Sequence, residues 1–125
     1  MKRCLLLVFL LMAVYSPVWG VDVQDAVMTT AVENRAPVDD VEVFPSADGQ
    51  LYCFSRIVGA AEPTEVAHLW YRGEELMSRT VLSVKSPSWR TWSTKKFLPE
   101  WQGHWRVEIR DAAGELLQTL TFELI

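Results

Sequence analysis

The stretch at residues 103–124 reads GHWRVEIRDAAGELLQTLTFEL, and apolar and polar residues alternate along both of its halves. A period of two places one set of side chains in the core and the other in water. The central Asp111-Ala112-Ala113-Gly114 has the composition of a turn. The stretch therefore predicts two neighbouring strands, 103–110 and 116–124, that cover one side of a core.

Further apolar segments precede this pair at short intervals, at residues 89–94, 76–84, 64–71 and 51–58. Arg72-Gly73-Glu74 is short enough to connect two of them as a hairpin. Segment 51–58 is apolar on both faces, as a central strand requires. Upstream we expect a loose leader at 21–25, an edge strand at 27–32 and an extended segment at 41–44. The pattern predicts an all-β fold, an antiparallel immunoglobulin-like sandwich of about seven strands.

The N-terminus predicts export. Met1-Lys2-Arg3 is basic, Cys4 to Val14 is an unbroken apolar run, and Val18 and Gly20 suit the small pockets of a signal peptidase. We expect a helical signal peptide at 1–20, cleaved after Gly20. The alternative is an uncleaved anchor, but spanning a bilayer takes about 20 apolar residues. Contact with a membrane would then be transient, and the product periplasmic or secreted.

The rest of the chain divides into an acidic N-terminal segment, 21–50, that holds the first strands, and a β-sandwich core domain, 51–125. Removal of Lys2 and Arg3 lowers the Lys+Arg count from 12 to 10 against 16 Asp+Glu, a net charge of about −6. Nucleic acid is an improbable partner for such a chain, because phosphate contacts need a basic face. Cys53 has no cysteine left to pair with, and we expect it to be a buried small hydrophobe.

Several segments together resemble one bacterial family. They are Leu51-Tyr52-Cys53-Phe54-Ser55-Arg56-Ile57-Val58-Gly59, His68-Leu69-Trp70-Tyr71, residues 84–93 (VKSPSWRTWS) and residues 98–107 (LPEWQGHWRV). In that order they are similar to the domain-of-unknown-function family numbered 2914, over roughly residues 50–123. Asn34-Arg35-Ala36-Pro37 resembles the stretch that precedes the domain in its relatives. The resemblance implies a bacterial, often exported domain without an established activity, so it supplies no catalytic residue.

Catalysis has little support in the residues themselves. The two histidines, His68 and His104, lie on separate predicted strands and in no metal-ligand spacing. The acidic pairs Asp39-Asp40 and Glu74-Glu75 point in opposite directions on extended chain, so they form no acid–base dyad. We expect no enzyme, no metal and no cofactor. An unrecognised hydrolase would require His68 and His104 to converge with a carboxylate.

One stretch, residues 85–96 (KSPSWRTWSTKK), is basic and aromatic within an acidic protein. On a strand Trp89 and Trp92 face opposite sides, so only one can enter the core and the other lies outside with Arg90. An indole beside a guanidinium is an effective contact surface for a glycan or a protein. The candidate binding residues are Lys85, Trp89, Arg90, Trp92 and Trp101.

Two other interpretations of this stretch stay open. Arg90 could instead support the sandwich by stacking on Trp92, Trp101 or Trp105. The whole domain could also be a structural subunit that pairs strand edges with an unidentified envelope protein or with itself. The leading hypothesis is a non-catalytic binding or accessory module of the bacterial envelope.

Overall fold

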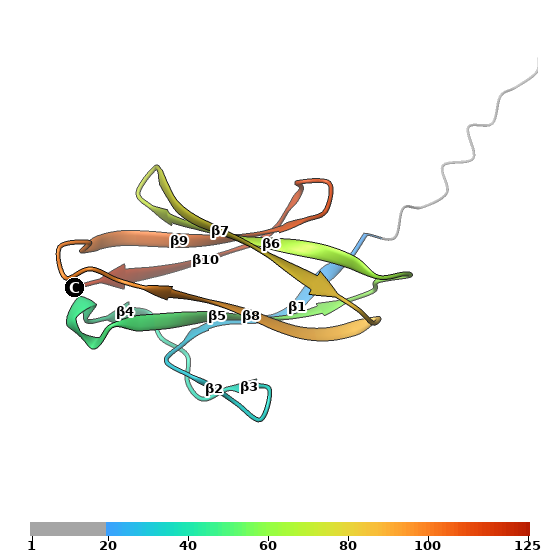
Figure 1. Ribbon diagram of the computed structural model, residues 1–125, viewed down its shortest axis with the longest axis horizontal. Coiled ribbons are helices and arrows are strands. Elements are labelled where there is room, and N and C mark those ends of the chain that lie inside the picture. The colour runs from blue at the N-terminus through green and yellow to red at the C-terminus, as the bar shows by residue number, and fades with distance from the viewer. Residues whose placement is uncertain (1–19) are drawn as a thin grey trace, which may run out of the picture.

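The computed structural model describes residues 20–125, and these residues fold into strands connected by turns (Figure 1). The seven long strands are β1 (Asp22–Thr29), β5 (Gln50–Val58), β6 (Thr64–Arg72), β7 (Glu75–Val84), β8 (Ser88–Lys96), β9 (Gly103–Asp111) and β10 (Leu116–Leu124). The short elements are β2 (Val32–Glu33), β3 (Ala36–Pro37), β4 (Val43–Phe44) and the 3₁₀ turn η1 (Ser46–Asp48). The predicted all-β class is confirmed. The predicted signal peptide lies outside the described residues, apart from Gly20.

Two sheets lie one over the other (Figure 1). One has the strand order β1-β5-β8, and the other has the order β4-β10-β9-β6-β7. From β4 onward, the chain changes sheet between β4 and β5, between β5 and β6, between β7 and β8, and between β8 and β9. β2 and β3 form a separate small hairpin that projects from the three-stranded sheet (Figure 1).

The alternation in residues 103–124 produces the antiparallel pair β9–β10. Trp105, Val107 and Ile109 are buried between the sheets, while Arg106 and Arg110 lie on the other face. The predicted hairpin of β6 and β7 and the central position of β5 are also observed. β4 pairs parallel with the end of β10, so the ladders are not all antiparallel.

The N-terminal strand differs from its prediction. β1 begins at Asp22, so residues 22–25 are not a loose leader, and the strand ends at Thr29. Its ladder with β5 contains a register shift between Val23 and Asp25. A bulge of this kind adds one residue and lets side chains three positions apart reach the same face. Val23 and Ala26 therefore both pack against the core, although their spacing breaks the period of two.

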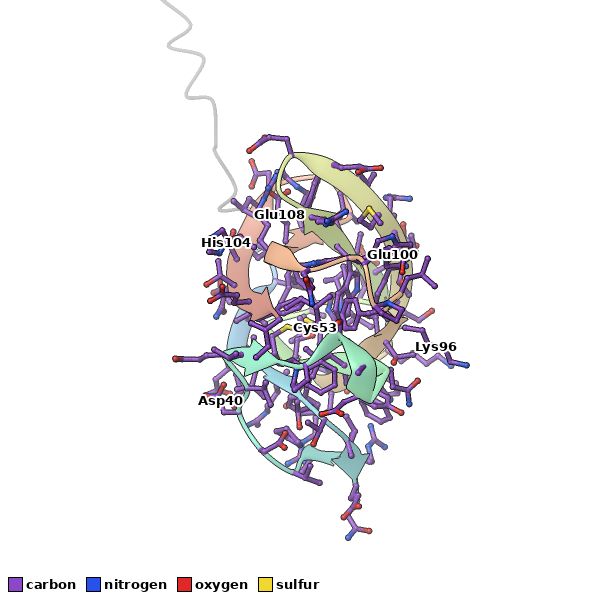
Figure 2. The ribbon with its side chains drawn as sticks, turned by 90° about the vertical axis from the view of Figure 1, so that its left-hand side faces the viewer. Asp40, Cys53, Lys96, Glu100, His104 and Glu108 are labelled. Carbon is purple, nitrogen blue, oxygen red and sulfur yellow. The ribbon has the colours of Figure 1, made fainter. Side chains whose placement is uncertain are left out.

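Aromatic side chains fill the space between the sheets at one end. The rings of Phe97 and Trp105 lie 5.0 Å apart, and those of Trp105 and Phe122 lie 5.9 Å apart. Trp70 contributes its fully buried indole. Cys53 is also fully buried between the sheets (Figure 2), and burial raises the pKa of its thiol. The free cysteine is thus packed as a small hydrophobe, as expected.

A chain of polar side chains crosses the middle of this core. Trp70 Nε1 donates to Ser93 Oγ at 3.1 Å, and Ser93 Oγ lies 2.7 Å from His68 Nδ1. His68 Nε2 lies 3.2 Å from Ser55 Oγ, which donates to the carbonyl of Thr91. Because Ser55 gives its proton to Thr91, it accepts from His68 Nε2–H, and Nδ1 then accepts the Ser93 proton. Neutral His68 therefore bonds β6 to both β5 and β8.

Ser93→Ala should destabilise the fold more than a surface serine substitution does. It removes the acceptor of Trp70 Nε1–H and the donor to His68 Nδ1, and each buried group left unpaired costs about 1–3 kcal/mol. Ser83→Ala, on the exposed side of β7, is the matched control and should change the unfolding free energy by less than about 0.5 kcal/mol. Urea unfolding followed by tryptophan fluorescence measures both. Equal effects of the two variants would contradict the network.

The free energy of unfolding should also decrease when the pH is lowered, because of His68. Burial lowers the pKa of His68 to about 4, whereas the unfolded side chain has a pKa of about 6.5. The unfolded chain therefore takes up a proton before the folded protein does. The contribution of neutral His68 to the free energy of unfolding is therefore full above pH 6.5 and is lost as the pH falls toward 4. About 2 kcal/mol of it is lost between about pH 7 and pH 5.

Urea unfolding of the wild type and of His68→Gln at these two pH values measures that loss. The window lies above the ordinary range of carboxyl groups, so acidic side chains contribute little to it. The variant, which cannot titrate there, should lose less stability than the wild type. The same loss in both proteins would show that His68 is not the source.

Candidate functional site

The aromatic and basic stretch forms β8, an edge of the three-stranded sheet. The registers of β1 and β8 against β5 align side chains into rows across the outer face of this sheet. The two central rows are an apolar row of Val27, Phe54 and Trp92 and a charged row of Asp25, Arg56 and Arg90. The two rows are neighbours, so together they form one amphipathic surface.

The two tryptophans of β8 face opposite sides, as the strand period predicts. Trp89 is half-buried and packs against the core. Trp92 is half-buried on the outer face, where its ring stacks on Phe54 with centroids 6.4 Å apart and planes inclined by 16°. Phe54 is buried beneath this stack, so the face presents the half-buried Trp92 ring beside the charged row.

Arg90 is exposed, and its Nη1 donates to the carbonyl of Arg35 at 3.3 Å. Among the described residues, the cations that stack on tryptophan are Arg35, 5.5 Å from the Trp89 ring, and Lys95, 5.1 Å from the Trp101 ring. Arg90 is in neither stack, so the stacking role left open for it is not observed there. Its guanidinium stays on the surface.

Trp101 and Lys85 lie away from Trp92 and Arg90. Trp101 precedes β9, its ring is 6.3 Å from that of Trp105, and its carbonyl accepts a hydrogen bond from Trp105 Nε1. Lys85 is exposed in the connection between β7 and β8. Of the five sequence-predicted site residues, the outer face brings together Arg90 and Trp92.

The β2–β3 hairpin covers part of the charged row. Asn34 and Arg35 form its tip with φ angles of 51° and 61°, the left-handed values that tight hairpin turns require. Asn tolerates this conformation, whereas Arg pays a steric penalty there. The Arg35 carbonyl and side chain reach Arg90 and Trp89, so both contacts connect the tip to β8.

Asp39 holds the base of this hairpin. Its carboxylate accepts hydrogen bonds from Thr29 Oγ1 at 2.6 Å, from the Thr30 amide at 2.8 Å and from Thr30 Oγ1 at 2.6 Å. Burial alone would raise the pKa of Asp39, but the hydrogen bonds from Thr29 and Thr30 outweigh it and lower the pKa below its usual value. The aspartate therefore closes the loop that begins where β1 ends.

A groove lies between the hairpin and the sheet, with a volume of about 280 Å³. It is lined by Asp25, Val27, Ala36, Pro37, Phe54, Arg56 and Arg90. Sequence reasoning identified Arg90 and missed the other residues, because they come from three separate segments. The pairing of Arg56 with Arg90 follows only from the strand register.

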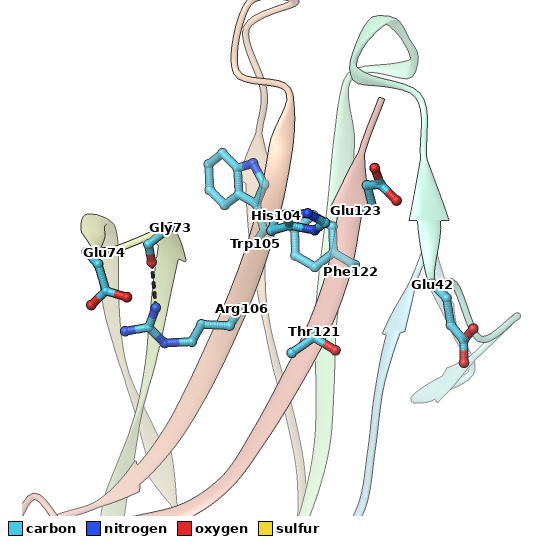
Figure 3. Close-up of a pocket in the computed structure, with 9 residues that line it drawn as sticks. All are labelled: Glu42, Gly73, Glu74, His104, Trp105, Arg106, Thr121, Phe122 and Glu123. Carbon is cyan, nitrogen blue, oxygen red and sulfur yellow. Dashed lines mark hydrogen bonds between the residues drawn. The ribbon is translucent and has the colours of Figure 1, made fainter.

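A larger cavity, of about 560 Å³, lies on the other sheet (Figure 3). Glu74 lies at one end of it and Glu42 at the other, and Arg106 donates to the Gly73 carbonyl between them (Figure 3). The Arg106 guanidinium stacks on Tyr71 at 4.0 Å and pairs with Glu108 at 3.2 Å. Arg106 is therefore occupied by contacts within the protein.

Glu108 is nearly buried between two arginines on β9. Arg110 donates to Glu108 Oε1 through Nη2 at 2.9 Å, and Arg106 donates to Oε2 through Nε at 3.2 Å. Burial would raise the pKa of Glu108, but the hydrogen bonds and charges of Arg110 and Arg106 outweigh it and lower the pKa. In the sequence, Arg106, Glu108 and Arg110 were recognised only as the polar residues of an alternating pattern.

The two histidines are not brought together. His68 is fully buried in the core, while His104 is exposed at the start of β9 and lines the larger cavity. Within residues 20–125 no group of three His, Cys, Asp or Glu side chains is placed to hold a metal ion. In that part of the chain no helix is long and apolar enough to cross a membrane.

No curated protein matches the chain. The sequence model of one family, described as "Protein of unknown function (DUF2914)", matches residues 63–124. The match runs from the residue before β6 to the end of β10, so it leaves out β1 to β5 and the hairpin. The expected resemblance, which began near residue 50, is confirmed over this shorter range. Residues 63–124 of the chain therefore belong to DUF2914, a family of proteins of unknown function.

Proposed function

We propose that the chain is an exported, non-catalytic binding or accessory module of the bacterial envelope. Its contact surface is the outer face of the three-stranded sheet, and its partner is a glycan or another envelope protein. One observation carries the proposal: Arg90 and Trp92 lie on the same open face, and Trp92 stacks on Phe54 beside a groove. Exposed aromatic and arginine side chains together are typical of contact hot spots.

The scaffold that supports this face is an immunoglobulin-like sandwich. The strand orders β1-β5-β8 and β10-β9-β6-β7 support this assignment, because a Greek-key sandwich also has strands that cross between its two sheets. Strands of this class form a rigid support whose outer faces are available for contacts. Export rests on the basic and apolar N-terminus, and the non-catalytic role rests on the separation of His68 from His104.

A second candidate is a structural subunit that pairs through a strand edge. β7 is a ten-residue edge strand with Leu76 and Val81 exposed, and an exposed edge of this length can add a partner strand. β8 is the less suitable edge, because Arg90, Lys95 and Lys96 place charge along it. A stable oligomer in light scattering that is lost on Leu76→Lys would favour this candidate.

The double variant Arg90→Ala and Trp92→Ala should weaken partner binding at least tenfold. Each truncation removes a contact of the kind that costs more than about 1 kcal/mol at hot spots. The measurement is binding of the purified protein to immobilised neutral and acidic oligosaccharides and to envelope-protein fractions. Arg79→Ala, exposed on β7 of the other sheet, is the control and should bind as the wild type does.

Circular dichroism of the double variant shows whether the fold is kept, because Arg90 is exposed but Trp92 is half-buried and stacks on Phe54. Unchanged binding by a folded double variant would place the contact surface elsewhere. Loss of binding in Arg79→Ala instead would move it to the five-stranded sheet.

A further inference from the structure

The charged row of the groove contains two arginines in direct cross-strand contact positions. Arg56 on β5 stands opposite Arg90 on β8, and both line the groove. Side chains at such positions have Cβ atoms about 4.5–5.5 Å apart, and like charges there repel each other. The row carries two positive charges and one negative charge in a protein whose net charge is −4. It is a local basic site in an acidic molecule.

The contacts within the protein compensate these charges only in part. Arg56 Nη1 lies 4.0 Å from Asp25, at the limit of an ion pair, and both side chains are open to water. Arg56 Nε donates to Ser88 Oγ at 3.1 Å, and Arg90 Nη1 donates to the Arg35 carbonyl at 3.3 Å. A guanidinium carries five N–H donors. Most donors of the pair therefore have no partner among residues 20–125, and both arginines line the same groove.

The other walls of the groove are apolar. Val27 and Phe54 belong to the neighbouring row, and Ala36 and Pro37 come from the hairpin. Rows two residues apart on a strand are separated by roughly 7 Å. A ligand that fits both rows has an anionic group at one end and a flat or apolar body of a few ångströms beside it.

The shape of the groove favours a compact ring over an extended chain. Arg35 closes the β8 side, because its carbonyl holds Arg90 and its guanidinium covers Trp89. A peptide strand that added to the β8 edge would have to displace both contacts. The volume of about 280 Å³ is also below the roughly 300–1,000 Å³ of sites for drug-sized ligands.

We propose that this groove binds a sugar that carries a carboxylate, with the carboxylate between Arg56 and Arg90 and the ring against the apolar wall of Val27, Ala36 and Pro37 under the hairpin. This inference rests on the proposed function and names the ligand class of the same face. Arginine suits this task, since its planar fork matches a carboxylate with two parallel hydrogen bonds. Asp25 acts against the ligand by neutralising part of the charge of Arg56.

The test is an NMR titration of the purified protein with two matched probes. Methyl α-D-glucuronide and methyl α-D-glucoside differ only in the carboxylate. The glucuronide should bind at least tenfold more tightly, with the largest amide shifts at residues 36, 54–56 and 90–92. Higher salt should weaken its binding, because the groove is open to solvent.

Variants that change the charge of the groove should change the affinity for the glucuronide in opposite directions. Arg56→Gln and Arg90→Gln should each weaken glucuronide binding about tenfold, whereas Asp25→Asn should strengthen it two- to threefold. Arg79→Gln on the other sheet should change nothing. Since all of these residues are at least partly exposed, unfolding is not expected to obscure the result.

Three outcomes would overturn the inference. The first is that the two sugars bind equally well and that Trp92→Ala abolishes the binding of both. The binding face would then be correct, but the preference for an acidic sugar would be wrong. The second is tighter binding of tetraglutamate than of the glucuronide in the same groove, which would make the ligand an acidic peptide. The third is that the glucuronide does not bind. The inference of an acidic sugar would then be wrong, and the Arg90 and Trp92 double variant would still test whether this face binds a partner.

Discussion

The hydrogen bonds that cross the core at His68 determine what the surface of β8 presents. Ser93 bonds to His68 and Trp70 from the inner side of the strand, and Thr91 lies buried on the same side. Because successive side chains on a strand point to opposite faces, Trp92 and Arg90 must then point outward. A slip of one residue would reverse both faces at once. It would leave His68 without its partner and would bury the arginine.

The same constraint explains why the two sheets keep one relative position. Apolar packing alone tolerates small shifts, whereas a buried imidazole needs a specific donor and acceptor. His68 takes one from each of two strands of the opposite sheet, Ser55 on β5 and Ser93 on β8. The register between β5 and β8 then places Arg56 beside Arg90 on the outer face. The same register of β5 and β8 therefore sets both the hydrogen bonds of His68 in the core and the pairing of Arg56 with Arg90 on the surface.

The hairpin adds the part of the groove that the sheet cannot provide. Asp39 ties the loop to the end of β1, and Arg35 reaches the far edge at β8. The loop is therefore anchored on both sides of the three-stranded sheet. The hairpin lies outside residues 63–124, which the family model matches. The wall of the groove that Ala36 and Pro37 form is therefore not part of the matched segment.

Local alternation was enough to predict β9, β10 and the opposite orientation of the two tryptophans in β8, because these depend on the strand period alone. β1 was misplaced, since a bulge near Gln24 breaks that period. The parallel partner of β4 lies about 80 residues away along the chain, and no local pattern reports such a pairing. Arg56 and Asp25 were missed for the same reason, because a row across a sheet depends on registers between distant segments. In the sequence Asp39 was only one half of an acidic pair, and its hydrogen bonds with Thr29 and Thr30 follow from the fold of the loop.

The central claim is that the outer face of the three-stranded sheet meets the partner, and photo-crosslinking in the producing cells tests it most directly. A benzophenone side chain at position 94, exposed on β8 beside the apolar row, should give a specific adduct with a glycan or a protein. The same group at position 79, on the other sheet, should give none. An adduct at position 79 with none at position 94 would contradict the account and assign the contact to the five-stranded sheet.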